Sequence, residues 1–167
     1  MQVDLWGGST SRLTGGHLFP VIKYTLHPKY DIITWDYDVM IMEVARAFEN
    51  FPFVEPVPLP SSCLTECCDV CPPTTVRVAG WGIFNMETGQ LPSVLQEITQ
   101  NIMSNEECNL QWDKEITDRM FCVSIELGID SCDGDSGSAI MLRKERQVGL
   151  VSTGSAFCGG KPFIIYY

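Results

Sequence analysis

The chain has 167 residues, of which 45% are hydrophobic, and a net charge of −10. This length allows one domain or two small, closely joined barrels, and the apolar content is enough for a packed core. The acidic charge argues against nucleic acid and anionic membranes as partners, because both would repel it. No apolar run approaches the roughly 18 residues of a membrane helix, and no signal peptide is expected after Met1.

Short segments rich in β-branched and aromatic residues predict a mostly β structure. Turn signals such as Gly15-Gly16 and Pro72-Pro73 separate these segments, a spacing typical of antiparallel barrels. A helix is expected to begin at Ser104, because Ser104 and Glu107 have the spacing of a capping box. The expected strands cover 19–26, 39–44, 75–79 and 147–151.

Eight cysteines in so short a chain indicate an oxidising compartment and therefore an extracellular location. A zinc site is not expected, because the only two histidines, His17 and His27, lie far from most of the cysteines. Adjacent Cys67 and Cys68 are not expected to pair with each other. Their pairing, and that of Cys63 and Cys71, stays open.

The most informative motif is the segment 130–137, Asp-Ser-Cys-Asp-Gly-Asp-Ser-Gly. A lone Gly-x-Ser-Gly would fit an ordinary tight turn. Here a cysteine, an aspartate directly before the serine and a second aspartate six residues before it make the pattern far more specific. The segment resembles the active-serine segment of trypsin-like serine proteases, and the resemblance covers essentially the whole chain.

This resemblance implies an all-β fold of two antiparallel β-barrels, the first of them partial. The expected division is a partial first barrel at 1–50, a linker at 51–75 and a second barrel at 76–167. The resemblance also implies that Ser136 is the catalytic nucleophile and that the backbone amides of Gly134 and Ser136 form the oxyanion hole. Asp135 matches the carboxylate that pairs with the new N-terminal ammonium after activation cleavage.

A second catalytic residue is expected upstream, at Asp38 in Trp35-Asp36-Tyr37-Asp38-Val39. An aspartate before a strand is usually a turn residue. The family, however, places the carboxylate that orients its histidine immediately before an apolar strand, so Asp38 is the match and Asp36 is not.

Substrate recognition is expected at Asp130, whose position matches the carboxylate at the base of the primary pocket and which would select Lys or Arg. The alternative is a solvent-facing loop aspartate. Ser131 neighbours it, and Ser152, Thr153 and Gly154 match the edge strand that binds the substrate backbone. Thr153 stands where the family usually has Trp, which favours a more open neighbouring subsite. Phe163 could fill the pocket.

The resemblance also implies two disulfides that brace the pocket, Cys108 with Cys122 and Cys132 with Cys158. A further family bridge falls on Val76 and Leu142, where both positions are apolar. No calcium site is expected in the loop 7–16, which lacks the paired acidic residues of calcium-binding members.

The general base is not evident. His17 and His27 are both poor candidates, because neither lies in the His-Cys segment that the family places tens of residues before its catalytic aspartate. The chain is therefore interpreted as a fragment that lacks the N-terminal segment with the histidine and the C-terminal helix, and it is expected to be inactive as written.

The predicted function is that of a secreted trypsin-like serine endopeptidase, which cleaves after Lys or Arg through a Ser-His-Asp acyl-enzyme mechanism. Its expected partners are protein or peptide substrates with Lys or Arg at the cleavage site and protease inhibitors, with no cofactor and no metal. The alternative is a non-catalytic protease homologue that acts as a binding or regulatory module. Retention of Asp38, Asp130 and Ser136 together favours the enzyme.

Overall fold

The computed structural model describes residues 3–60, 70–112, 115–124, 130–143, 146–154, 158 and 162–166, the last range including only the backbone of 163, 164 and 166. The chain forms two compact units, Met1–Pro56 and Val57–Tyr167. The boundary between them falls within the segment 51–75 that was expected to join the barrels. Regular structure in the described residues is nearly all β, so the predicted all-β class is confirmed.

The first unit is a three-stranded antiparallel sheet in the order β1-β2-β3. Its strands are β1 (Asp4–Gly7), β2 (His17–Leu26) and β3 (Met40–Val44). The last two coincide with the strands expected at 19–26 and 39–44.

Aromatic packing holds the first unit together. Phe19 of β2 is only 1% exposed, and its ring centroid lies 4.8 Å from that of Phe48 and 5.0 Å from that of Phe51. The Arg46 guanidinium lies over the Phe51 ring, 4.9 Å from its centroid, and donates to the Leu18 carbonyl. Because the cation is both hydrogen-bonded and stacked on a ring, it can lie among aromatic side chains.

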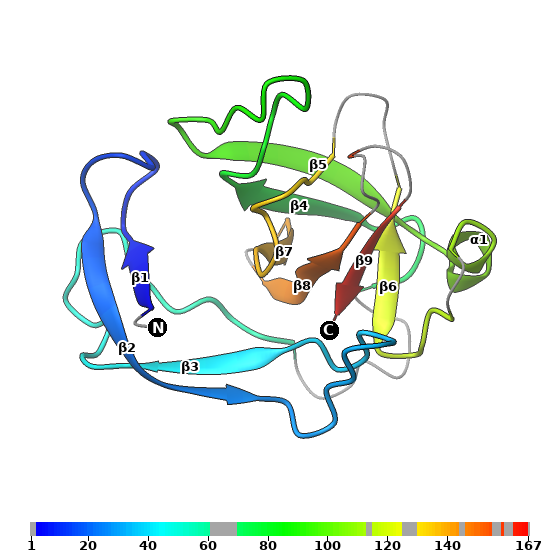
Figure 1. Ribbon diagram of the computed structural model, residues 1–167, viewed down its shortest axis with the longest axis horizontal. Helices are drawn as coiled ribbons and strands as arrows, with labels where there is room; N and C mark the ends of the chain where they lie inside the picture. Colours follow the sequence, from blue (N-terminus) through cyan, green and yellow to red (C-terminus); the bar gives the residue numbers. More distant parts are fainter. Residues whose placement is uncertain are drawn as a thin grey trace. The chain divides into compact units, whose positions relative to one another are not determined.

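The second unit contains a closed antiparallel barrel in the order β4-β5-β6-β9-β8-β7 (Figure 1). Pairing of β4 with β7 closes it. One short helix, α1 (Asn105–Asn109), follows β5. The strands are β4 (Thr75–Gly80), β5 (Gln96–Met103), β6 (Met120–Val123), β7 (Ala139–Leu142), β8 (Gln147–Thr153) and β9 (Phe163–Tyr166).

Inward-facing apolar residues fill the barrel. In β4 the burial alternates along the strand, so that Val76 and Val78 point inward, as the period of two in a β-strand requires. A hydrophobic cluster joins these two residues to the other strands of the barrel. Its remaining buried members are Ile102, Phe121, Val123, Ile140, Val148, Val151 and Ile165.

A smaller core lies beneath α1, where Cys108, Ile116, Met120 and Cys122 are buried. The helix begins as predicted: the Ser104 hydroxyl accepts from the Glu107 N–H at 3.1 Å. The Glu107 carboxylate in return accepts from the Ser104 N–H at 3.3 Å. Among the residues that the structure describes, no helix has both the length and the apolar character needed to cross a membrane.

Candidate active site

The segment 130–137 precedes β7 and forms two successive turns. The Asp135 N–H donates to the Cys132 carbonyl at 2.9 Å, and the Ser138 N–H donates to the Asp135 carbonyl at 2.9 Å. Gly134 and Gly137 adopt φ angles of +98° and +84°, where a Cβ atom would be strained. These turns leave Ser136, between the two glycines, exposed to solvent.

Neighbouring strands hold this loop in place. The Gly137 N–H donates to the Val151 carbonyl at 2.8 Å, and the Val151 N–H donates to the Ser138 carbonyl at 3.0 Å. On its other side the loop accepts a hydrogen bond at 2.9 Å, from the Ile83 N–H to the Asp133 carbonyl. The exposed serine therefore lies on a loop that is fixed at both β8 and the segment after β4.

Asp135 is the buried centre of the loop, with 8% of its surface exposed. Its Oδ1 accepts from the Gly82 N–H at 2.8 Å and its Oδ2 from the Cys132 N–H at 3.0 Å. Two backbone donors thus offset part of the cost of removing this carboxylate from water. They also connect the nucleophile loop to the segment after β4.

Gly80 and Gly82 leave room for that carboxylate. A Cβ atom would lie 2.9 Å from the Asp135 Cγ if placed at Gly80, and 2.5 Å if placed at Gly82, closer than real Cβ contacts allow. The motif Gly80-Trp81-Gly82 is therefore part of the Asp135 site. No role was predicted for this motif from the sequence, although two glycines that flank a tryptophan at the end of a strand are a signal of close backbone approach.

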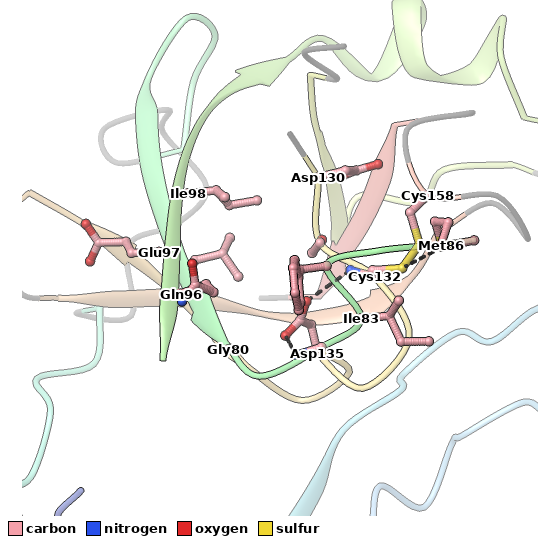
Figure 2. Close-up of a pocket in the computed structure, with 14 residues that line it drawn as sticks. Gly80, Ile83, Met86, Gln96, Glu97, Ile98, Asp130, Cys132, Asp135 and Cys158 are labelled. Atoms are coloured by element: carbon pink, nitrogen blue, oxygen red, sulfur yellow. Dashed lines mark hydrogen bonds between the residues drawn. A yellow bond between two sulfur atoms is a disulfide. The ribbon is translucent and has the colours of Figure 1, made fainter. Parts of the chain in front are cut away.

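A pocket of about 340 Å³ adjoins the loop. Figure 2 shows Asp130 and Asp135 among the side chains around it. Ser131 lines the same pocket and is 2% exposed, and its Oγ has no hydrogen-bond partner among the described residues. Apolar side chains contribute much of the rest of the wall, chiefly Val78, Ile83, Met86 and Ile98. With Glu97, the pocket therefore combines three carboxylates with an apolar lining.

The other residues predicted to bind the substrate do not line this pocket. Ser136 and the segment 152–154 are not among the described residues that line this pocket. Along β8, the pairing with β7 runs from Gln147 to Leu150, whereas the pairing with β9 runs from Leu150 to Thr153. Ser152 and Gly154 are half-buried, and Thr153 is 7% exposed.

Both disulfides implied by the resemblance are present. Cys108 of α1 is bonded to Cys122 of β6, with a Cα–Cα separation of 6.2 Å. Cys132 of the nucleophile loop is bonded to Cys158, with a Cα–Cα separation of 5.4 Å. Figure 2 shows Met86 beside the second disulfide. This bond attaches the loop to the segment that follows β8.

Asp38 belongs to the first unit, two residues before the start of β3, and is half-buried. The preceding Tyr37 has a φ of +56°, a strained value for a residue with a side chain. Its ring stacks on His27 with a centroid distance of 4.5 Å, and Lys29 Nζ lies 5.5 Å from its centroid. The His27 N–H donates to the Val39 carbonyl at 3.0 Å. The chain around Asp38 is thus held by backbone and ring contacts.

The second histidine also packs against an aromatic ring, because His17 lies 4.9 Å from Phe51 between ring centroids. No cluster of three or more potential metal ligands occurs among the residues for which positions are described. Cys63, Cys67 and Cys68, together with the side chain of Phe163, lie outside the described part of the chain, so the predictions about them stay open.

The trypsin family model matches the chain over residues 1–167. Among curated proteins, trypsin II-P29 of Gallus gallus is 38% identical over 132 residues, which cover 77% of this chain and 49% of that protein. Trypsin V-A of Rattus norvegicus is 34% identical over 168 residues, covering 97% of this chain and 64% of that protein. Kallikrein-14 of Homo sapiens is 32% identical over 139 residues, which cover 83% of this chain and 49% of that protein.

The chain thus spans about half to two thirds of the length of these relatives. The matched family model extends over both units, the sheet that contains β1 to β3 and the barrel that contains the serine loop. The resemblance inferred from the segment 130–137 is confirmed by this match. The chain belongs to the trypsin family.

Proposed function

We propose that this chain is part of a trypsin-like serine endopeptidase that cleaves after Lys or Arg through an acyl-enzyme. The observation that carries the proposal is the construction of the loop 130–137. An exposed serine lies between two glycines of positive φ, above a buried, hydrogen-bonded Asp135. Such a loop presents a hydroxyl to a substrate and keeps its backbone fixed, as nucleophilic catalysis requires.

In the proposed mechanism, the Ser136 hydroxyl attacks the substrate carbonyl and the proton passes to a histidine. The amides of Gly134 and Ser136 donate to the oxyanion that forms. Asp38 accepts from that histidine and stabilises its imidazolium form. We do not assign the base to His17 or His27, because both rings pack against aromatic side chains of the first unit. The mechanism needs a histidine other than these two.

Asp135 is proposed to accept the N-terminal ammonium that activation cleavage releases. Its carboxylate has two backbone donors and also lines the 340 Å³ pocket, which has room for a further group. A cation with a short apolar segment would match the carboxylates and the apolar wall of this pocket. Binding it would offset the remaining cost of burying the Asp135 charge.

Asp130 is proposed to pair with the Lys or Arg side chain of the substrate. The Ser131 hydroxyl, which has no hydrogen-bond partner among the described residues, is proposed as a second polar contact. The segment from Ser152 to Gly154 is proposed to bind the substrate backbone as an added strand. The partners would then be protein or peptide substrates with Lys or Arg at the cleavage site, together with protease inhibitors. The two disulfides support an extracellular location.

Covalent labelling tests the nucleophile directly. The full-length protein is treated with a fluorophosphonate after activation, and we expect stoichiometric labelling of the wild type and none of Ser136→Ala. Ser138→Ala is the matched control and should label normally. Hydrolysis of an Arg peptide in preference to a Phe peptide, abolished by Asp130→Ser, would support the proposed specificity.

A second candidate is a non-catalytic homologue that binds rather than cleaves. Thr153, the last residue of β8, stands where the family usually has tryptophan, and this difference favours it. Absence of labelling in a protein whose two disulfides are formed would decide for this alternative and against the endopeptidase.

A further inference from the structure

Gln100 is a buried amide in the middle of β5, with only 2% of its surface exposed. Side chains two residues apart on a strand share a face, so Gln100 lies in the same row as Ile98 and Ile102. Both isoleucines pack in the hydrophobic core of the barrel. An amide therefore occupies a position where the neighbouring residues of the same face are apolar.

The two hydrogen bonds of this amide explain its place. Its Nε2 donates to the Ser124 carbonyl at 3.1 Å and to the Asp130 Oδ1 at 3.3 Å. Ser124 directly precedes, and Asp130 directly follows, residues 125–129. One nitrogen on β5 thus donates to both Ser124 and Asp130, and it holds the carboxylate that lines the pocket.

Packing alone does not account for a glutamine here. The Gln100 Oε1 is buried and has no hydrogen-bond partner among the described residues. An unpaired buried acceptor is unfavourable, and an apolar side chain of similar shape would avoid the loss. What an apolar residue could not provide is the donor to the Ser124 carbonyl and to Asp130, and of these two acceptors only Asp130 presents a charged group to the pocket.

We propose that Gln100 is a positioning residue for Asp130, which fixes the direction of its carboxylate and stabilises its charged form for binding a cationic side chain. The role in cation binding rests on the proposed function. The positioning itself does not, because it follows from the geometry around Nε2. A hydrogen bond to one carboxylate oxygen restricts rotation of the side chain and favours the ionised state.

Gln100→Met tests this role, because methionine keeps the length and much of the volume and lacks the donor. Carbon-detected NMR of the 167-residue chain follows the titration of each carboxyl group that lines the pocket, namely Asp130, Asp135 and Glu97. In the variant we expect the Asp130 midpoint to rise by about one pH unit, since a donor to the charged form is lost. Gln147→Met is the matched control, because the Gln147 amide donates to the Gly149 carbonyl at 3.3 Å and to no carboxylate.

An unchanged Asp130 midpoint in folded Gln100→Met would overturn the proposal. The wild type provides a measurement that requires no change at position 100. The side-chain amide protons of Gln100 should shift with pH as Asp130 titrates, and this shift should vanish in Asp130→Asn. The proposal would also be contradicted if the side-chain amide protons of Gln100 did not shift with pH in the wild type.

Binding of benzamidine, a small planar amidinium cation, separates the two proposals. We expect Gln100→Met to weaken its binding to the chain by about tenfold, the equivalent of one hydrogen bond to a charged group. If the wild type binds benzamidine through Asp130 and Gln100→Met binds it with the same affinity, the role of Gln100 in cation binding is refuted. If Gln100→Met moves the Asp130 midpoint but the wild type does not bind the amidinium, the positioning role stands and the proposed specificity fails.

Discussion

Val76 of β4 and Leu142 of β7 are direct partners across the strands that close the barrel. Val76 is fully buried, and Leu142 packs against the same hydrophobic core. These are the positions on which the resemblance placed a disulfide in other members of the family. In this chain an apolar cross-strand pair occupies both positions, so the barrel closes there by packing and backbone pairing.

Reintroducing the bridge should stabilise the second unit. Opposite residues in an antiparallel pair have Cα atoms about 4.5–5.5 Å apart, within the range of disulfide-bonded cysteines. We expect Val76→Cys combined with Leu142→Cys to form a disulfide that raises the free energy of unfolding by about 2–4 kcal/mol over the unbridged double variant. Mass spectrometry of unreduced peptides and urea denaturation check this. The two single variants, which cannot form the bridge, should both be less stable than the wild type.

The strands that the sequence predicted share one property. Segments 19–26, 39–44, 75–79 and 147–151 are compact runs of apolar or β-branched residues, and each lies largely within an observed strand. The sequence did not predict strands β1, β6, β7 and β9, which have only four residues each. It also missed the longer strand β5, which reads Gln-Glu-Ile-Thr-Gln-Asn-Ile-Met and has more polar than apolar residues. Pairing with β4 and β6 fixes β5 as a strand, and such long-range pairing cannot be read from local composition.

Removing the Asp135 carboxylate should destabilise the second unit. In Asp135→Ala the N–H groups of Gly82 and Cys132 lose their acceptors while buried. Each such loss costs about 1–3 kcal/mol, so we expect the two together to lower the free energy of unfolding by about 2–6 kcal/mol. Chemical denaturation measures it. Asp133→Ala, a neighbouring exposed aspartate, is the control, and an equal loss in both variants would contradict this account of Asp135.

Gly82→Ala should destabilise the second unit because its methyl group would meet the Asp135 carboxylate, and not because of backbone strain at residue 82. The added methyl group would overlap the carboxylate, so we expect a loss of about 2 kcal/mol or more. In the Asp135→Ala background the clash partner is gone, and Gly82→Ala should then cost much less. A double-mutant cycle measures this coupling, and additive effects of the two substitutions would show that they are independent. Gly7→Ala, where the nearest atom would be 3.6 Å away, should be nearly neutral.

The candidate site, like the set of strands, has a part that the sequence predicted and a part that only the structure revealed. The residues of segment 130–137 are contiguous in the sequence, so a local pattern was enough to identify them. Gly80, Gly82 and Gln100 contribute through contacts with Asp130 or Asp135, which lie 30 to 55 positions away in the sequence. Glycine and glutamine are common residues, and what they do here is determined by the folded barrel and not by their neighbours in sequence.

The helix start at Ser104 is the smallest feature predicted from sequence, and it can be tested separately. Ser104→Ala removes the acceptor of the Glu107 N–H, and we expect a loss of about 1 kcal/mol in the stability of the second unit. Glu107→Ala removes the reciprocal bond to the Ser104 N–H, so the two substitutions should cost less together than the sum of their separate effects. Urea denaturation provides the numbers, with the exposed Ser93→Ala as the control. Since α1 carries Cys108, amide exchange should also quicken near the Cys108–Cys122 disulfide in Ser104→Ala. Unchanged exchange and stability would mean that the disulfide alone fixes this helix.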